Sequence, residues 1–173
     1  MEVYSNIPTE QQKSHSAQSQ STTNKLVSLS SIQSYSNHNL NIPTPKILLL
    51  EDTPILQVAN MTLLKSLGCD VDLAKTGIDA IKMFCNGYHL IFLDIGLPDI
   101  SGITVAKAIR SEEVENNSPR NVLIALTAFG EKMAEECLEA GMDDYYTKPI
   151  LSEQLKQVLS KWLPFIFKTD GDL

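Results

Sequence analysis

The segment LIFLDIGLPDISG, residues 90–102, places four apolar residues directly before an acid, Asp94. A short run that is wholly apolar is typical of a strand buried on both faces of a parallel sheet. The glycine- and proline-rich residues behind it are typical of a loop. We therefore expect Asp94 at the carboxyl end of a central strand, the edge at which open α/β sheets bind ligands. An isolated acid in such a place is more often a helix cap or a solvated strand end, so its role depends on the other strand ends.

The composition limits the classes of function. The 173 residues carry a formal net charge of −7, which argues against nucleic acid or an anionic membrane as the main partner. No apolar run approaches the roughly 18 residues that span a bilayer, and the amino terminus shows no signal-peptide pattern. The cysteines form no CxxC motif and predict small buried thiols in a reducing cytoplasm: Cys69, Cys85 and Cys137.

The chain divides into three segments by composition. More than half of residues 1–44 are Ser, Thr, Asn or Gln, and few are charged. Such a segment cannot bury enough apolar surface to offset its ordering entropy, so we expect a disordered tail or linker. Residues 45–164 carry the patterns of a folded domain. Residues 165–173 form a short extension whose first, apolar side chains either fold back on the domain or contact a partner.

Five apolar runs alternate with five helical patterns in the folded segment. The predicted strands are residues 47–50, 71–74, 90–94, 122–126 and 144–146. The predicted helices are residues 55–67, 77–85, 103–110, 132–140 and 152–163, and residues 112–119 are expected to form a polar loop. This alternation indicates a doubly wound α/β fold, in which a five-stranded parallel sheet carries helices on both faces.

The first predicted helix has a clear start. Thr53 is a typical N-cap residue, and Pro54 suits the first helical position. The apolar positions of this helix fall near helical spacing: Ile55, Val58, Ala59, Leu63 and Leu67. In the next strand Asp70 and Asp72 alternate with apolar residues, which predicts an edge strand.

Polar residues follow four of the predicted strands. They are Glu51 and Asp52, Asp94, Thr127, and Lys148. Because the carboxyl ends of parallel strands lie at one rim, we expect one pocket with three carboxylates, a hydroxyl and an ammonium group. Crowded carboxylates need a cation, and hard oxygen ligands suit Mg²⁺. A carboxylate beside Mg²⁺ can attack a phosphoryl group, and the lysine and hydroxyl can neutralise its oxygens.

These motifs resemble the receiver domain of two-component response regulators. They are the acid pair Glu51–Asp52, LDIGLPDISG around Asp94, ALTA around Thr127, and Lys148–Pro149, and the match covers roughly residues 46–163. The wording is closer to receivers of hybrid sensor kinases than to those joined to DNA-binding domains. The resemblance implies a flavodoxin-like architecture and a signalling role, with no catalysis beyond the domain's own phosphorylation and dephosphorylation.

The resemblance also implies roles for single residues. It makes Asp94 the phosphoryl acceptor, with Thr127 and Lys148 contacting the phosphoryl oxygens and Tyr145 acting with Thr127 as a switch. It implies a cis Lys148–Pro149 bond. The metal would be held by four residues: Asp52 and Asp94 directly, Glu51 through water, and Gly96 through its backbone carbonyl.

The implied partners are a sensor histidine kinase or a histidine phosphotransfer protein. Two mechanisms stay open: Asp94 carries the group onward in a phosphorelay, or its phosphorylation remodels a binding face. That face would comprise the helix at 132–140, the strand at 144–146 and the helix at 152–163, through which the domain could also dimerise.

Two alternatives belong to other classes. A phosphatase of the haloacid dehalogenase type needs a second acid two residues after the first, where this chain has Gly96. A protein-binding module with a vestigial site is disfavoured by the complete set of polar groups. Gly96, with bulky Phe129 two residues after Thr127, also leaves no side chain to orient hydrolytic water, so we expect partners to set the phosphoryl lifetime.

Overall fold

A parallel sheet of five strands forms the centre of the domain. The computed structural model describes residues 43–129 and 133–167. Its strands are β1 (Lys46–Leu50), β2 (Asp70–Ala74), β3 (Leu90–Asp94), β4 (Val122–Thr127) and β5 (Asp144–Thr147). They are ordered β2-β1-β3-β4-β5, and every neighbouring pair is parallel. The predicted five-stranded parallel sheet is confirmed, with the segment around Asp94 in its central strand.

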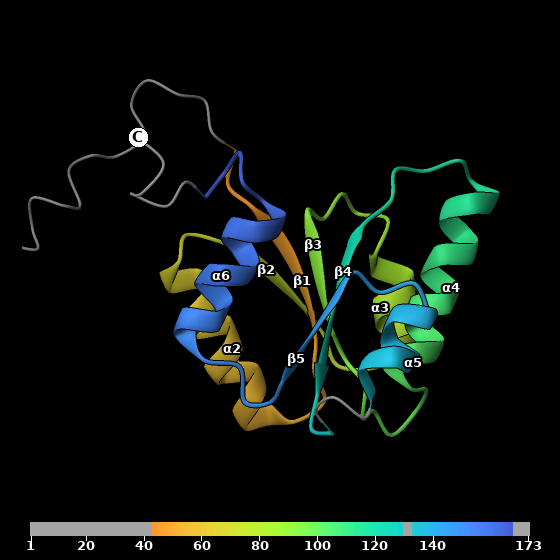
Figure 1. Cartoon of the computed structure of the whole chain (residues 1–173), viewed down its shortest axis with the longest axis horizontal. Coiled ribbons are helices and arrows are strands. Elements are labelled where there is room, and N and C mark those ends of the chain that lie inside the picture. The colour runs from red at the N-terminus through yellow and green to blue at the C-terminus, as the bar shows by residue number, and fades with distance from the viewer. Residues whose placement is uncertain (1–42, 130–132, 168–173) are drawn as a thin grey trace, which may run out of the picture. The chain divides into compact units, whose positions relative to one another are not determined.

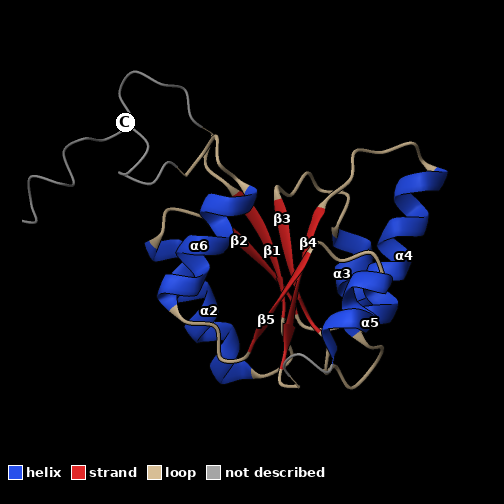
Figure 2. Ribbon diagram, in the orientation of Figure 1, coloured by secondary structure: helices blue, strands red, loops and turns tan. Residues whose placement is uncertain are grey.

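The helices cover both faces of this sheet. They are α2 (Pro54–Ser66), α3 (Gly77–Met83), α4 (Gly102–Glu115), α5 (Ala134–Glu139) and α6 (Ser152–Trp162). Figure 1 shows α2 and α6 on one face and α3, α4 and α5 on the other, and Figure 2 shows the strands between these two layers. The doubly wound architecture is therefore confirmed, although the predicted start of α5 at residue 132 lies outside the described residues.

The three inner strands are buried because they are apolar on both faces. Leu49, Phe92 and Ile124 are paired across β1, β3 and β4 and are fully buried against α2 and α6. The alternate residues, such as Leu48 and Ile91, pack with α3, α4 and α5. Two separate apolar clusters thus hold the sheet, which fits continuous apolar runs in parallel strands. Strand β2 is an edge strand, as its alternating acids predict.

The buried face of α2 differs from the prediction. Ile55 and Val58 are 73% and 65% exposed, whereas Gln57 and Asn60 are buried with Leu64. The amide of Gln57 donates a hydrogen bond to the backbone carbonyl of Glu51, 2.9 Å away. A buried amide is tolerated where it satisfies a buried carbonyl, so the helix turns a polar side chain inward.

Helix α4 is longer than predicted and continues to Glu115, through part of the expected loop. The reason is Glu113, which is buried and pairs with Arg110 at 2.6 Å. Its other oxygen accepts the backbone N–H of Asn121, at the start of β4, at 2.7 Å. This carboxylate therefore joins the end of the helix to the next strand. The segment was predicted to be a loop because its residues are polar.

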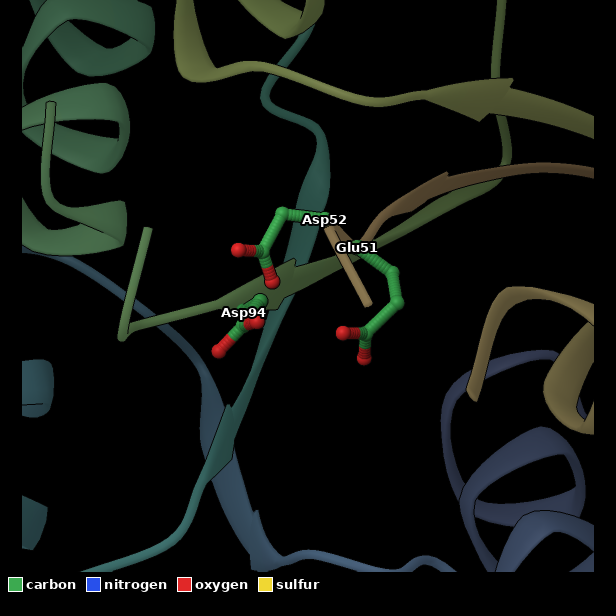
Figure 3. A group of neighbouring side chains, drawn as sticks. All are labelled: Glu51, Asp52 and Asp94. Carbon is green, nitrogen blue, oxygen red and sulfur yellow. The ribbon is translucent and has the colours of Figure 1, made fainter. Parts of the chain in front are cut away.

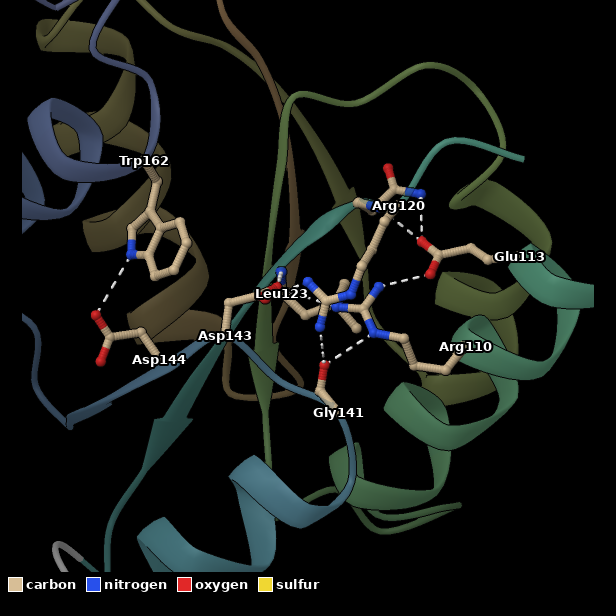
Figure 4. Close-up of polar contacts among 9 residues, drawn as sticks. Arg110, Glu113, Arg120, Leu123, Gly141, Asp143, Asp144 and Trp162 are labelled. Carbon is tan, nitrogen blue, oxygen red and sulfur yellow. Dashed lines mark hydrogen bonds and ion pairs between the residues drawn. The ribbon is translucent and has the colours of Figure 1, made fainter. Parts of the chain in front are cut away.

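The same arginine joins α4 to the turn before β5 (Figure 4). Arg110 donates to the carbonyl of Gly141 at 2.8 Å and to Asp143 at 3.0 Å. Asp143 also pairs with Arg120 and accepts the backbone N–H of Leu123. Gly141 has φ +89°, a conformation that favours glycine. These contacts fasten β4 and β5 at the end of the sheet opposite Asp94.

The carboxyl-terminal residues follow the first of the two expected alternatives, and one cysteine departs from its prediction. Ile166 and Phe167 pack against the apolar cluster under α2 and α6, while Phe165 is 90% exposed. Cys69 and Cys137 are buried as expected, but Cys85 is exposed, because it follows the last turn of α3.

The predicted tail lies outside the described residues, except for Pro43 and Thr44. Among the described helices, none combines the length and apolar character that a membrane span requires.

We predict that Glu113→Ala lowers the free energy of unfolding by about 3 kcal/mol, because one N–H group of Arg110 and the backbone N–H of Asn121 lose the carboxylate that accepts their hydrogen bonds. Urea denaturation measures the change. Glu115→Ala, on the exposed surface of the same helix, is the control and should stay within about 0.5 kcal/mol of the wild type. Equal losses in both variants would show that Glu113 does not fasten the helix.

Candidate functional site

The predicted polar residues converge at the carboxyl edge of the sheet. Glu51 and Asp52 follow β1, Asp94 and Thr127 end β3 and β4, and Lys148 follows β5. Glu51, Asp94 and Thr127 are 0%, 4% and 1% exposed. Burial of this much polar surface requires mutual compensation, because a buried charge without a partner is costly.

Three carboxylates and one ammonium group form the centre of the site. One oxygen each from Glu51, Asp52 and Asp94 lies within 4.8 Å of the others. Figure 3 shows the carboxylates of Asp52 and Asp94 together, with Glu51 reaching to one side. The Lys148 ammonium lies 2.6 Å from Glu51 Oε2 and 2.6 Å from Asp94 Oδ2. It therefore bridges two acids from different strands.

Glu51 is the most enclosed of these acids. Its Oε1 accepts the backbone N–H of Thr53 at 3.1 Å. Its Oε2 meets the Lys148 ammonium as an ion pair without the geometry of a hydrogen bond. Burial raises the pKa of Glu51 above its usual value, and the ammonium opposes that shift. A further cation near Glu51 would therefore stabilise its ionised form.

The loop behind Asp94 is fixed by short backbone contacts. Asp94 Oδ1 accepts the N–H of Gly96 at 2.9 Å. A Cβ at Gly102 would lie 2.2 Å from the Asp94 carbonyl oxygen, so only glycine allows the start of α4 to approach the strand end. Asp99 in the same loop accepts the N–H groups of Gly77 and Ile78, at the start of α3.

A cavity of about 570 Å³ opens over this centre. Its lining residues come from every loop at this edge that carries a predicted site residue: Asp52, Thr53, Leu56, Asp94, Gly96, Ala128, Phe129, Lys148 and Pro149. Phe129 is 65% exposed at the rim, and Gly96 contributes no side chain. The cavity therefore admits a small group to Asp94 and offers no acid or amide at the two positions predicted to flank attacking water.

The donor set fits Mg²⁺. Three carboxylates against one ammonium leave an excess of two negative charges, and all the available ligands are oxygens. Mg²⁺ prefers one or two carboxylates, supplemented by waters and phosphate oxygens. Asp52 and Asp94 would hold it with the Gly96 carbonyl, while Glu51, turned toward Lys148, suits contact through water.

The hydroxyl of Thr127 and the ring of Tyr145 occupy different surroundings. Thr127 Oγ1 accepts the N–H of Phe129 at 3.0 Å, so the hydroxyl oxygen is used as an acceptor and its proton is available for another acceptor. Tyr145 is half-buried against the cluster under α3, α4 and α5. Its neighbour Tyr146 packs on the opposite face and donates to Asp144. The Lys148–Pro149 bond is cis, as the resemblance implies.

Two residues of this site were not predicted from the sequence. Gln57 holds the carbonyl of Glu51, and Leu56 lines the cavity. A glutamine in an amphipathic helix is normally a surface residue, so the spacing of Gln57 does not indicate that it is buried. The only signal is that Gln57 lies about one turn into a helix that begins beside two acids.

Comparison with known proteins identifies relatives over this domain. The family model described as the response regulator receiver domain matches residues 47–160. Hybrid signal transduction histidine kinase L of Dictyostelium discoideum is 36% identical over 123 residues, covering 68% of this chain and 7% of that kinase. The sensor protein GacS of Pseudomonas syringae is 35% identical, covering 71% of this chain and 14% of GacS. This chain therefore matches only a small part of these relatives' length.

Two solved structures are similar in fold and sequence. One is a receiver domain of Saccharomyces cerevisiae Ssk1, crystallised with the histidine phosphotransfer protein Ypd1. It has a TM-score of 0.67 and 33% identity, covering 76% of this chain and 97% of that chain. The other is the receiver domain of the Pseudomonas aeruginosa sensor histidine kinase PA1611, with magnesium coordinated in its active-site cleft. It has a TM-score of 0.63 and 35% identity, covering 70% and 99% of the two chains.

We predict that Lys148→Met lowers the free energy of unfolding by about 3 kcal/mol in EDTA, since it leaves buried carboxylates without their cation. Saturating MgCl₂ should recover part of the loss, because a metal can replace the missing charge. Lys156→Met is the matched control: it removes an exposed pair with Glu153 and should change stability by less than about 1 kcal/mol. A loss no larger than the control's, measured by denaturation, would contradict the bridging role.

Proposed function

The chain belongs to the response regulator receiver domain family, and from this we propose that it accepts a phosphoryl group on Asp94. The donor would be a phosphohistidine of a sensor kinase or a histidine phosphotransfer protein. One observation carries the proposal: Asp52, Asp94 and Lys148 line one cavity, and Lys148 also pairs with the buried Glu51. Thr127, at the end of the neighbouring strand β4, precedes the cavity residues Ala128 and Phe129. Such convergence serves no purpose for stability alone, because crowded acids repel.

The proposed reaction transfers phosphorus from nitrogen to oxygen. An Asp94 oxygen attacks the phosphorus in line, the P–O bond forms, and the P–N bond to the donor imidazole breaks. Mg²⁺, when bound, neutralises phosphoryl oxygens. Lys148 shifts its ammonium group from Asp94 to one of these oxygens. The Thr127 hydroxyl donates a hydrogen bond to another.

We propose that this chemistry stores the group rather than turning over small esters. Gly96 stands where a dehalogenase-type phosphatase carries its second acid, and an exposed Phe129 supplies bulk but no polar group. Neither position can orient a water for in-line attack on the acyl phosphate. The lifetime of the phosphorylated form would therefore be set by partners, and the domain would catalyse only its own phosphorylation and dephosphorylation.

The switching face would follow from Thr127. When its hydroxyl turns to the phosphoryl group, it releases the N–H of Phe129 and so shifts residues 128–129. Tyr145, half-buried on the next strand, could then turn inward into the vacated space. The altered surface would comprise α5, β5 and α6, a face that a second copy could also occupy.

A docking surface for the phosphodonor lies beside the cavity. Ile55 and Val58 are exposed on one side of α2, which begins directly after the acid pair. Phe129 adds a third exposed apolar side chain at the cavity rim. We propose that a histidine phosphotransfer protein docks here. The complex of the similar receiver Ssk1 with Ypd1 supports this class of partner.

The relay role is favoured over a free-standing switch. The curated relatives are hybrid kinases, in which a receiver forms a small part of the length. Residues 1–44 would then be a linker, residues 45–164 the receiver and residues 165–173 an extension, in a cytoplasmic protein. Passage of the group from Asp94 to a histidine phosphotransfer protein would separate the two mechanisms.

We predict that the protein gains one phosphoryl group from acetyl phosphate when MgCl₂ is present, and none in EDTA. Intact-protein mass spectrometry measures the adduct, and its decay after donor removal gives the lifetime. Asp94→Asn should abolish the adduct, while Asp99→Asn, in the same loop, should retain it. An adduct on Asp94→Asn, or one that forms without metal, would overturn the proposed acceptor.

For the docking surface, we predict that Val58→Glu slows transfer from a phosphorylated histidine phosphotransfer protein by roughly tenfold, since it places a charge in an apolar contact. The reaction with acetyl phosphate should not change, because Val58 does not line the cavity. Val114→Glu, at an apolar position near the end of α4 that is even more exposed, is the control. Equal transfer rates for both variants would exclude α2 from the interface.

A further inference from the structure

The first turn of α2 lacks the cap that its sequence predicts. Thr53 occupies the N-cap position, but its side chain accepts no backbone N–H from the helix. The equivalent residues of the next two helices behave normally. Thr76 accepts the N–H of Asp79 at 3.1 Å, and Ser101 accepts the N–H of Thr104 at 3.2 Å. The hydroxyl of Thr53 therefore has another partner.

That partner is the acid pair. The Thr53 hydroxyl donates to Asp52 Oδ1 at 3.2 Å, and the Thr53 backbone N–H donates to Glu51 Oε1 at 3.1 Å. One residue thus contacts both carboxylates through separate groups. Among the described residues, the hydroxyl is the only hydrogen-bond partner found for the Asp52 carboxylate.

The backbone of the acid pair is held from the other side. Gln57 donates from Nε2 to the Glu51 carbonyl at 2.9 Å, and both residues are buried. This bond fixes the peptide that joins Glu51 to Asp52. Asp52 is only half-buried and lies in no ion pair among the described residues, so its side-chain torsion is the remaining freedom. The Thr53 hydroxyl restrains that torsion.

We propose that Thr53 is a positioning residue for the metal, holding the Asp52 carboxylate toward Asp94 so that both offer an oxygen to one Mg²⁺. The inference rests on the proposed function, because it assumes that the metal binds between these two acids. Hydrogen bonds to ligating carboxylates orient them before binding, and their loss typically lowers metal affinity by 10- to 100-fold. The helix gives up its side-chain cap for this orientation.

The competing explanation is an ordinary N-cap whose hydroxyl turns back to the helix. The two roles predict opposite results for removing the hydroxyl alone. Thr53→Val keeps the shape and the backbone N–H but has no hydroxyl. A cap would lose thermal stability without metal, by roughly 4 °C for a domain of this size. A positioning residue would lose Mg²⁺ affinity with the unfolding temperature unchanged.

The test titrates MgCl₂ into the full chain and follows the amide NMR shifts of the acceptor loop. The unfolding temperature is measured separately in EDTA. We expect Thr53→Val to bind Mg²⁺ roughly tenfold more weakly than the wild type and to unfold at the same temperature. Thr53→Ser, which keeps a hydroxyl, should restore affinity to within about threefold, a partial recovery that reflects its freer rotamer.

Thr76→Val is the matched control. It removes a hydroxyl that does cap a helix, so it should lower the unfolding temperature and leave the Mg²⁺ affinity unchanged. Wild-type affinity in Thr53→Val, or a loss of unfolding temperature in that variant, would overturn the positioning role. Failure of the wild type itself to bind Mg²⁺ would instead overturn the metal site of the proposed function.

Discussion

The ion pairs of Lys148 are the interactions on which the rest of the site depends. Two buried carboxylates, Glu51 and Asp94, lie at the ends of adjacent strands and share one ammonium group. Buried acids without a cation would be unstable, and the lysine alone does not balance the three carboxylates. The protein therefore keeps an excess of negative charge at this edge, which a divalent cation can neutralise.

The sequence predicts the strands and the site for a physical reason. Inner strands of a parallel sheet must be apolar on both faces, so their ends are visible as the first polar residues, such as Asp94 and Thr127. Parallel pairing then brings those ends to one edge whatever their separation in the chain. The charged and hydroxyl residues at four strand ends were predictable in this way, because topology alone places them together.

The errors occur where a buried polar side chain has a specific hydrogen-bond partner. The predicted buried face of α2 was wrong because Gln57 donates a hydrogen bond to the carbonyl of Glu51. The predicted end of α4 was too early because Glu113 accepts the backbone N–H of Asn121. In both cases hydropathy treats a polar residue as solvent-exposed, although a specific hydrogen bond offsets its burial. Cys85 is the opposite case: a residue predicted to be buried is exposed, because α3 ends at Met83 and Cys85 lies beyond it.

The alternating acids of β2 have a consequence for solubility. An open sheet ends in strands whose free N–H and C=O groups can recruit a strand from another molecule. Asp70 is exposed on this edge, and Asp72 is only partly enclosed by Lys46 and Tyr88. A second molecule that added a strand there would bring its own acids against these. The opposite edge, β5, has only four residues, so both borders of the sheet discourage aggregation.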